Sequence, residues 1–244
     1  MIYNLSNIKN PKYAIITNMH DINELLPNGL QLDKTENGLI LTDGKLSMKG
    51  DFSKMLPRIK QSNLEKELLI KAARIKNSSH NLTIIDATAG MGEDSFLLAA
   101  AGFNVYLFEQ DPIIAALLED SLFRASQDSA LEPIAKRMTL IPSNSIDGIK
   151  SFTEKIDVIY LDPMFPERSK SGLIKKKFQL LQQLEKPCDD EHGLLNAAIK
   201  ARPKKIIIKR PLKGPNLDGI KPDYSYSGKA IRIDVIAESL SRLA

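Results

Sequence analysis

Residues 82–110 read LTIIDATAGMGEDSFLLAAAGFNVYLFEQ, in which two apolar runs flank a glycine-rich turn and a helical segment. The first run, residues 82–88, predicts a buried strand, and residues 104–110 predict a second strand that ends in Glu109. Residues 94–102, between them, predict a helix. A strand, a turn, a helix and another strand form a βαβ unit, which favours a parallel sheet.

The same alternation continues along most of the chain. Further strands are expected at residues 138–143, 156–162, 204–210 and 231–237, and helices at residues 64–75, 112–126, 171–184 and 194–201. Apolar strands that alternate with helices are typical of an α/β fold whose sheet is covered on both faces. Because ligands on such sheets bind beyond the carboxyl ends of the strands, functional residues are expected directly after the strands.

The N-terminal region has a different texture. Short apolar segments at residues 13–17 and 39–42 lie among Asn-Gly dipeptides at residues 28–29 and 37–38, and these dipeptides favour hairpins. We therefore expect residues 1–60 to form a small β-rich lobe and residues 61–244 to form the main domain.

Composition excludes several classes of protein. The chain of 244 residues is 43% hydrophobic, and its net charge of +4 is compatible with nucleic acid without requiring it. Cys188 is the single cysteine, so an internal disulfide and a cysteine zinc cluster are excluded, and no metal is expected. With neither a signal-peptide pattern at the start nor a run of about 18 apolar residues, the sequence predicts a cytoplasmic protein without a membrane partner.

The turn at residues 86–94, DATAGMGED, is a candidate cofactor site. Gly90 and Gly92 can adopt positive φ and let a ligand approach the backbone, a feature shared by enzymes that use dinucleotides and by those that use S-adenosylmethionine. Ser95 stands where a dinucleotide fingerprint has its third glycine. Asp86 would repel a pyrophosphate but attract a sulfonium cation. These residues favour S-adenosylmethionine, although a turn without a ligand is an open alternative.

Polar residues after the next two strands extend the candidate cofactor site. Glu109 can accept hydrogen bonds from both hydroxyls of a ribose, a placement common to both classes of cofactor. Asn144 and Ser145 follow the strand at 138–143 and can hydrogen-bond an adenine edge. The alternative for this pair is a solvated loop.

The turn at residues 162–166, DPMFP, is the candidate site of chemistry. The carboxylate of Asp162 and the carbonyl of Pro163 are acceptors that a stiff turn can hold about 3 Å from an exocyclic amine, which aligns the nitrogen lone pair. Phe165 can stack on a base that has left its helix or loop. This chemistry requires no metal. The alternative is a turn that only ends a strand and packs a phenylalanine.

Positive charge follows this turn and the strand expected at 204–210. The candidate RNA contacts in these two segments are Arg168, Lys170, Lys175, Lys209 and Arg210. Such contacts to phosphate position a nucleic acid without reading its sequence. The alternative for the helical lysines is a solvated face.

Residues 86–122, 156–177 and 206–211 together resemble the ribosomal RNA small-subunit methyltransferase J family, and the similarity is close from residue 71 to residue 211. The resemblance implies a Rossmann-like class I methyltransferase that uses S-adenosylmethionine. It also implies that the N2 amine of one guanine near the 3′ end of 16S ribosomal RNA is methylated, either in the free RNA or in the small ribosomal subunit. Family cofactor contacts match Glu93, Asp94, Glu109, Gln110, Asn144, Ser145 and Asp162.

The sequence departs from the family pattern at three places. Arginine is more usual in the family at position 93, and a basic residue is more usual at position 110. The Gly- and Arg-rich run that precedes the first core helix is replaced here by residues 58–69. Arg58 and Lys60 are the RNA contacts that remain plausible in that segment.

Three other functions stay open at the level of sequence. An amino-methyltransferase acting on adenine or cytosine, in DNA or another RNA, would use the same chemistry. A non-catalytic RNA-binding or assembly factor would keep the scaffold without the cofactor. A nicotinamide-dependent oxidoreductase is disfavoured by Asp86 and by the missing third glycine.

Overall fold

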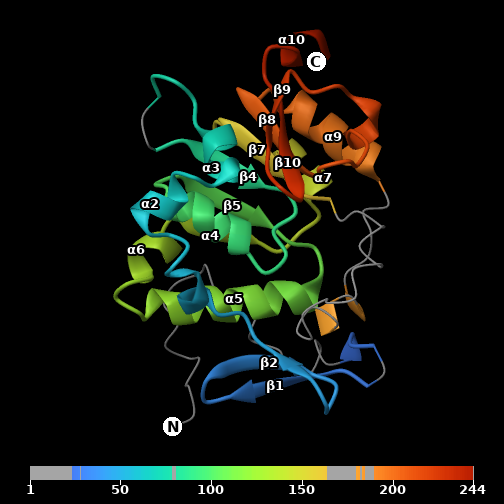
Figure 1. The fold of residues 1–244 in the computed structure, drawn as a ribbon. Helices are drawn as coiled ribbons and strands as arrows, with labels where there is room; N and C mark the ends of the chain where they lie inside the picture. The colour runs from blue at the N-terminus through green and yellow to red at the C-terminus, as the bar shows by residue number, and fades with distance from the viewer. Residues whose placement is uncertain are drawn as a thin grey trace.

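A seven-stranded sheet forms the centre of the protein (Figure 1). The computed structural model describes residues 24–27, 29–78, 81–163, 180–181, 183–184 and 190–243. The strands are β4 (Thr83–Asp86), β5 (Asn104–Phe108), β6 (Met138–Ile141), β7 (Val158–Leu161), β8 (Lys205–Pro211), β9 (Tyr224–Ser227) and β10 (Ile231–Ile236). Their order is β6-β5-β4-β7-β8-β10-β9, and the first five are parallel. Strand β10 is antiparallel to both β8 and β9. The expected Rossmann-like class I sheet is confirmed.

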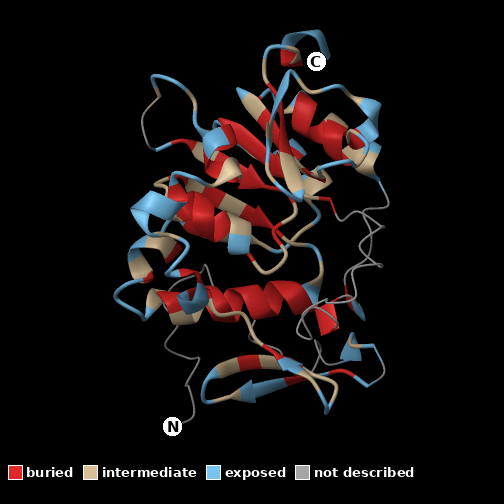
Figure 2. Cartoon of the chain, in the orientation of Figure 1, coloured by how far each residue is buried: buried red, intermediate tan, exposed pale blue. Residues whose placement is uncertain are grey.

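Helices cover both faces of the sheet. One face packs with α3 (Leu68–Ala73), α4 (Glu93–Ala100), α5 (Pro112–Ser126) and α6 (Glu132–Ala135), and the other with α7 (Ser145–Ser151) and α9 (Glu191–Lys200). Consecutive residues of β4 divide between the two layers, because Ile84 belongs to the first core and Ile85 to the second. The central strands are therefore buried on both faces (Figure 2).

A small antiparallel sheet packs beside α5. Strands β1 (Gln31–Thr35), β2 (Gly38–Thr42) and β3 (Ser47–Met48) form it, and residues 36–37 join the first two strands, so the hairpin expected near the Asn-Gly at 37–38 is confirmed. Leu32 and Leu41 share an apolar core with Leu117 of α5. The short helix η3 (Phe52–Met55) then brings Phe52 onto Phe96, with ring centroids 4.6 Å apart. The lobe thus shares its core with the main domain.

One expected helix is divided in two. Residues 64–75 were expected to be continuous, but α2 (Gln61–Leu64) ends before α3 begins, so that prediction is wrong. Glu67 between them is extended, with ψ 127°, and its carboxylate accepts two hydrogen bonds from Arg58, at 2.6 and 3.0 Å. The break therefore places the Arg58–Glu67 ion pair at the mouth of the site described below.

Several other elements differ from the expectations. Helix α7 and strand β9, with η5 (Leu217–Gly219) and α10 (Leu240–Leu243), were not expected. Asn144 explains α7, because its side chain caps the first turn. The short apolar segment at 13–17, in the expected β-rich lobe, and most of the helix expected at 171–184 lie outside the described residues. Within the described ranges, no helix has the length and apolarity needed to cross a membrane.

Candidate active site

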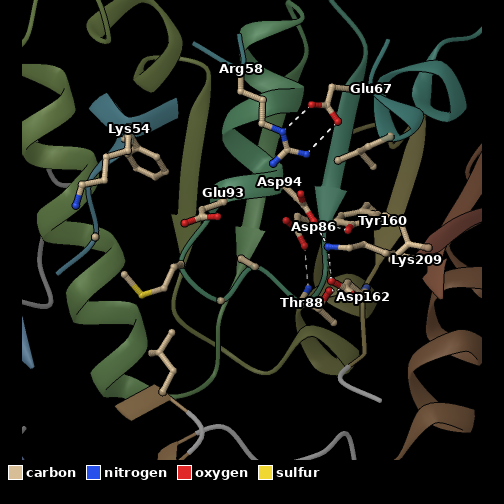
Figure 3. Close-up of a pocket in the computed structure, with 18 of the residues that line it drawn as sticks. Lys54, Arg58, Glu67, Asp86, Thr88, Glu93, Asp94, Tyr160, Asp162 and Lys209 are labelled. Atoms are coloured by element: carbon tan, nitrogen blue, oxygen red, sulfur yellow. Dashed lines mark hydrogen bonds and ion pairs between the residues drawn. The ribbon is translucent and has the colours of Figure 1, made fainter. Parts of the chain in front are cut away.

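A cavity of about 420 Å³ opens at the carboxyl ends of β4 and β7 (Figure 3). Its floor contains Asp86, Asp94, Tyr160, Asp162 and Lys209. Residues from the small lobe and the segment after it form another part of its wall, including Met48, Lys49, Phe52, Lys54 and Arg58. The parallel sheet therefore supplies the charged groups, and the lobe encloses them.

The glycine turn has the backbone conformation that the sequence predicts. Gly90 has φ +53° and Gly92 has φ +73°, both in the left-handed region that favours glycine. A methyl group added at Gly92 would lie 2.7 Å from a side-chain carbon of Leu118, so this position excludes larger residues. A methyl group added at Gly90 would meet no atom within 4 Å. Open space above a left-handed turn fits a ligand that approaches the backbone.

Asp86 is a buried carboxyl group at the end of β4. It is 1% exposed, and it accepts hydrogen bonds from the Ser95 hydroxyl at 2.6 Å and from the Thr88 amide at 3.1 Å. Burial, with a smaller contribution from the nearby carboxylates of Asp94 and Asp162, raises the pKa of Asp86 to about 7, although the hydrogen bonds from Ser95 and Thr88 oppose the shift. A cation beside this carboxyl group, such as a sulfonium or an ammonium, would favour its ionised form.

Asp94, on the first turn of α4, contacts side chains from the strands β7 and β8. Its Oδ2 accepts a hydrogen bond from the Tyr160 hydroxyl at 2.7 Å and lies 2.7 Å from Lys209 Nζ. Burial opposes ionisation of Asp94, but the ammonium of Lys209 outweighs it and holds the pKa of Asp94 below its usual value. Burial also raises the pKa of Tyr160 well above its usual value, so the phenol remains a hydrogen-bond donor.

Asp162, immediately after β7, joins the same network. Its Oδ2 lies 2.8 Å from Lys209 Nζ, and its amide donates to the Thr88 hydroxyl at 2.7 Å. Thr88 belongs to the glycine turn, so the turn expected to bind the cofactor and the turn expected to perform the chemistry are hydrogen-bonded to each other. Pro163, the next residue, is buried.

Glu109 lies beyond β5 and supports the glycine turn from its other side. One carboxylate oxygen accepts from the Gly90 amide at 2.9 Å, and the other accepts from the Asp111 amide at 2.8 Å. The carboxylate is half-buried and has further lone pairs, so it can also accept from ribose hydroxyls.

Asn144 follows β6, the next strand along the edge. Its Oδ1 accepts from the Ile146 amide at 2.9 Å, and its Nδ2 donates to Gln110 Oε1 at 2.8 Å. Asn144 and Gln110 are exposed, and Ser145 is the half-buried first residue of α7. Glu109, Gln110, Asn144 and Ser145 are not among the residues that line the cavity, so they form a second, more open part of the candidate site.

The residues expected to contact RNA have different environments. Lys60 is exposed, and Arg58 is half-exposed but paired with Glu67. The prediction that Arg210 contacts RNA is wrong, because its side chain is 1% exposed and donates to the Pro215 carbonyl inside the protein. Lys209 faces carboxylates of the cavity floor. Arg168, Lys170 and Lys175, together with Phe165 of the DPMFP turn, lie outside the described residues.

Three residues of the network were not singled out from the sequence. Ser95 was noted only as a missing glycine, whereas its hydroxyl binds Asp86. Thr88 gave no signal beyond its place in the turn. Tyr160 was visible as a polar side chain in the apolar strand 156–162, and a buried phenol requires a hydrogen-bond partner.

The sheet order, the left-handed glycine turn and the carboxyl groups beyond successive strands define a protein of the methyltransferase class that uses S-adenosylmethionine. Residues 18–238 match a family model described as "Putative SAM-dependent methyltransferase". The chain is also 32% identical to a SAM-dependent methyltransferase from Neisseria gonorrhoeae of known structure, with a TM-score of 0.71, and the match covers 87% of this chain and 84% of that one.

Curated relatives narrow the class to one family. The ribosomal RNA small subunit methyltransferase J of Marinobacter nauticus is 39% identical over 209 residues, which is 85% of this chain and 74% of the relative. The protein of the same name from Pseudomonas syringae is 46% identical over 154 residues, which is 63% of this chain but only 57% of the relative's length. The chain belongs to the ribosomal RNA small subunit methyltransferase J family.

Proposed function

We propose that the protein transfers a methyl group from S-adenosylmethionine to the N2 amine of one guanine near the 3′ end of 16S ribosomal RNA. The observation that carries the proposal is the hydrogen bond from the Asp162 amide to the Thr88 hydroxyl, at 2.7 Å. It ties the acceptor turn to the glycine turn, so a methyl donor and a target amine bound at these turns would be neighbours. The names of the curated relatives support the substrate class.

The residues present fit the cofactor. S-adenosylmethionine supplies, when bound, a methyl group activated by a positively charged sulfur. Asp86 lies where a carboxylate stabilises positive charge, Glu109 can accept from ribose hydroxyls, and the open space above Gly90 admits the ligand to the backbone. We propose that Glu93, Asp94, Gln110, Asn144 and Ser145 complete the cofactor contacts through side-chain or backbone groups.

Asp162 and Pro163 would act on the amine of the base. An exocyclic amine is a weak nucleophile because its lone pair is delocalised into the ring. Hydrogen bonds accepted by the Asp162 carboxylate and the Pro163 carbonyl would orient the N–H groups and direct the lone pair at the methyl carbon. As the nitrogen–carbon bond forms, the sulfur keeps the electron pair of the broken carbon–sulfur bond and becomes a neutral thioether, and the methylated amine releases one proton to water. Among the described residues, no group of three or more His, Cys, Asp or Glu is arranged to hold a metal ion.

Phe165 is proposed to stack on the flipped base, and this remains a prediction because Phe165 lies outside the described residues. We expect Phe165→Ala to weaken transition-state binding of the base by about 1–3 kcal/mol, the usual contribution of one stacked base. Comparison of kcat/KM for the RNA in the variant and the wild type measures this loss. A kcat/KM equal to that of the wild type would remove the residue from the mechanism.

The substrate is tested by methylation with isotopically labelled S-adenosylmethionine. Small ribosomal subunits, naked 16S ribosomal RNA and double-stranded DNA are offered in parallel, and the labelled nucleotide is mapped by mass spectrometry. Label on one guanine near the 3′ end of the RNA is the expected result. Label mainly in DNA, or on adenine or cytosine, would favour the other class of amino-methyltransferase.

A non-catalytic assembly factor on this scaffold would bind RNA without binding the cofactor. Isothermal titration with S-adenosylmethionine separates this candidate from the enzyme. Saturable binding that is weakened in Glu109→Ala supports the enzyme, whereas the absence of binding to the wild-type protein would contradict it.

A further inference from the structure

Lys209 connects three elements of the candidate active site. It projects from β8, and its Nζ lies 2.7 Å from Asp94 Oδ2 on α4 and 2.8 Å from Asp162 Oδ2 after β7 (Figure 3). Its side chain is 20% exposed. An ammonium group has three N–H donors, and these two carboxylates occupy the directions of two of them. Lys209 is therefore directed into the protein and not toward a phosphate at the surface.

The charge balance of the cavity floor explains why a cation is needed there. Asp86, Asp94 and Asp162 lie close enough that the carboxylates of the other two raise the pKa of Asp86. Two carboxylates that share a low-dielectric site repel each other and favour uptake of a proton. Lys209 lies between two of the three and offsets that repulsion.

Other charged or titratable groups face this network from each element packed around it. Arg58, paired with Glu67, lowers the pKa of Asp94 from the mouth of the cavity, and Glu93 stands beside Asp94 on α4. Tyr160 approaches from β7 as a neutral donor. The ammonium of Lys209 acts on Asp94 more strongly than the guanidinium of Arg58 does, and it also forms an ion pair with Asp162.

We propose that Lys209 is a positioning residue for methyl transfer, which holds the Asp162 carboxylate in a fixed orientation beside the target amine by bridging it to Asp94. The proposal rests on the proposed function. A carboxylate has about four lone-pair positions, so Asp162 can accept an N–H of the amine while it remains bound to Lys209. The role differs from the phosphate contact that the sequence suggested for this lysine.

The test compares Lys209→Met with Lys155→Met as a matched control. Both substitutions remove one lysine charge, but Lys155 is exposed and precedes β7, at the opposite edge of the sheet from the cavity. For Lys209→Met we expect kcat on small ribosomal subunits to fall on the order of 100-fold, the loss typical of a displaced reacting group. The KM for the RNA substrate should stay within about twofold of the wild-type value, as should both constants of Lys155→Met.

The pH profile separates positioning from a merely structural role. Without the ammonium, the carboxylates of Asp94, Asp162 and Asp86 repel one another, so the group takes up a proton more readily. The acid limb of kcat should therefore move to higher pH in Lys209→Met, and activity should recover partly above it. Lys209→Arg, which retains the charge, should return the limb toward its wild-type position.

Asp94→Asn is an independent variant, in which the acid limb of kcat should move in the opposite direction. It removes one carboxylate and leaves the ammonium on Asp162, so the acid limb should move to lower pH. If Lys209→Met shows no cooperative thermal transition and is therefore not folded, Asp94→Asn still tests the proposed role of Lys209. An acid limb that is unchanged in the variants that fold would overturn the proposal.

A phosphate contact gives a different result. In that case Lys209→Met would raise the KM for RNA, reduce the slope of log affinity against log salt by about 0.7–0.9, and leave kcat and the pH profile unchanged. Wild-type protein that methylates no RNA would refute the proposed function itself. Active wild-type protein with the phosphate-contact pattern would refute only the inference about Lys209.

Discussion

The two parts of the candidate site are built in different ways. In the first part, the largely buried charges of Asp94, Asp162 and Lys209 pair across two strands and a helix, and the buried carboxyl group of Asp86 lies beside them. Around Glu109 and Asn144, half-buried or exposed side chains bind backbone amides of their own turn or of the neighbouring glycine turn. Because desolvated charges add little net stability even when they are paired, we infer that the first part retains its charges for binding or chemistry. The second part also stabilises local structure, so substitutions there should affect folding and binding together.

The largest expected effect lies in the first part. Asp162→Ala removes the carboxylate that orients the amine, and we expect kcat to fall on the order of 1,000-fold. The protein should still fold, because the Asp162 amide keeps its hydrogen bond to Thr88. Single-turnover methylation with labelled cofactor measures the rate, and circular dichroism checks the fold. A rate near that of the wild type would show that this turn does not perform the chemistry.

Glu109→Ala tests the second part. It removes an acceptor of the ribose hydroxyls and leaves the Gly90 and Asp111 amides without their partner, so we expect affinity for S-adenosylmethionine to fall by about 10- to 100-fold. Affinity for RNA should change far less. Glu109→Gln, which keeps one carbonyl acceptor, should lose less affinity for the cofactor. Isothermal titration and filter binding measure the two ligands. An equal loss for both ligands would show that the substitution has disrupted the site as a whole.

The raised pKa of Asp86, in the first part of the site, predicts how the free energy of unfolding depends on pH. Burial raises it to about 7 in the folded protein, against an ordinary value of 3.8. The folded protein therefore holds the proton more tightly than the unfolded chain, and its free energy of unfolding falls as pH rises from about 4 to about 7. Asp86→Asn should remove this decline and raise the free energy of unfolding at pH 8 by on the order of 2 kcal/mol. Urea denaturation at several pH values measures it.

The same substitution should weaken cofactor binding. Wild-type affinity for S-adenosylmethionine is expected to rise with pH until Asp86 is ionised near pH 7, whereas the affinity of Asp86→Asn should show no such rise. Titration in buffers of different ionisation enthalpy would detect the proton released as the cation binds. If Asp86→Asn were less stable than the wild type at pH 8, the charge of Asp86 would not be the cause of the expected pH dependence.

The sequence predicted the sheet and much of the first part because both depend on local pattern. Apolar runs identify strands, and the parallel order places the residues after β4 and β7 at one edge. The expected strands of the sheet therefore lie close to their observed bounds, although β9 was missed, and Asp86 and Asp162 were found as neighbours. Glycines at 90 and 92 were identified because few other residues adopt a positive φ.

The predictions for the basic residues of β8 failed because the sequence does not show to which face of the sheet a side chain points. Lys209 and Arg210 were both expected to contact RNA, because both end a strand at the reactive edge of the sheet. Successive residues of a strand point to opposite faces, so Lys209 reaches the cavity floor while Arg210 enters the layer beneath α9 and forms an ion pair with Glu191. The break in the helix at Glu67 accompanies a contact with Arg58, nine residues away, which helical periodicity does not reveal.

Asn144, in the second part of the site, gives the smallest expected effect. Both polar atoms of its side chain are bonded within the protein, to the Ile146 amide and to Gln110, so capping of α7 is its principal contribution. Asn144→Ala should lower the free energy of unfolding by about 1 kcal/mol, the usual value of an N-cap. Asn144→Asp keeps the cap but loses the amide donor, so it should retain most of that stability. If Asn144→Asp nevertheless binds S-adenosylmethionine more than about tenfold more weakly than Asn144→Ala does, the residue faces the adenine directly, and the second part of the site is more specialised than its exposed side chains indicate.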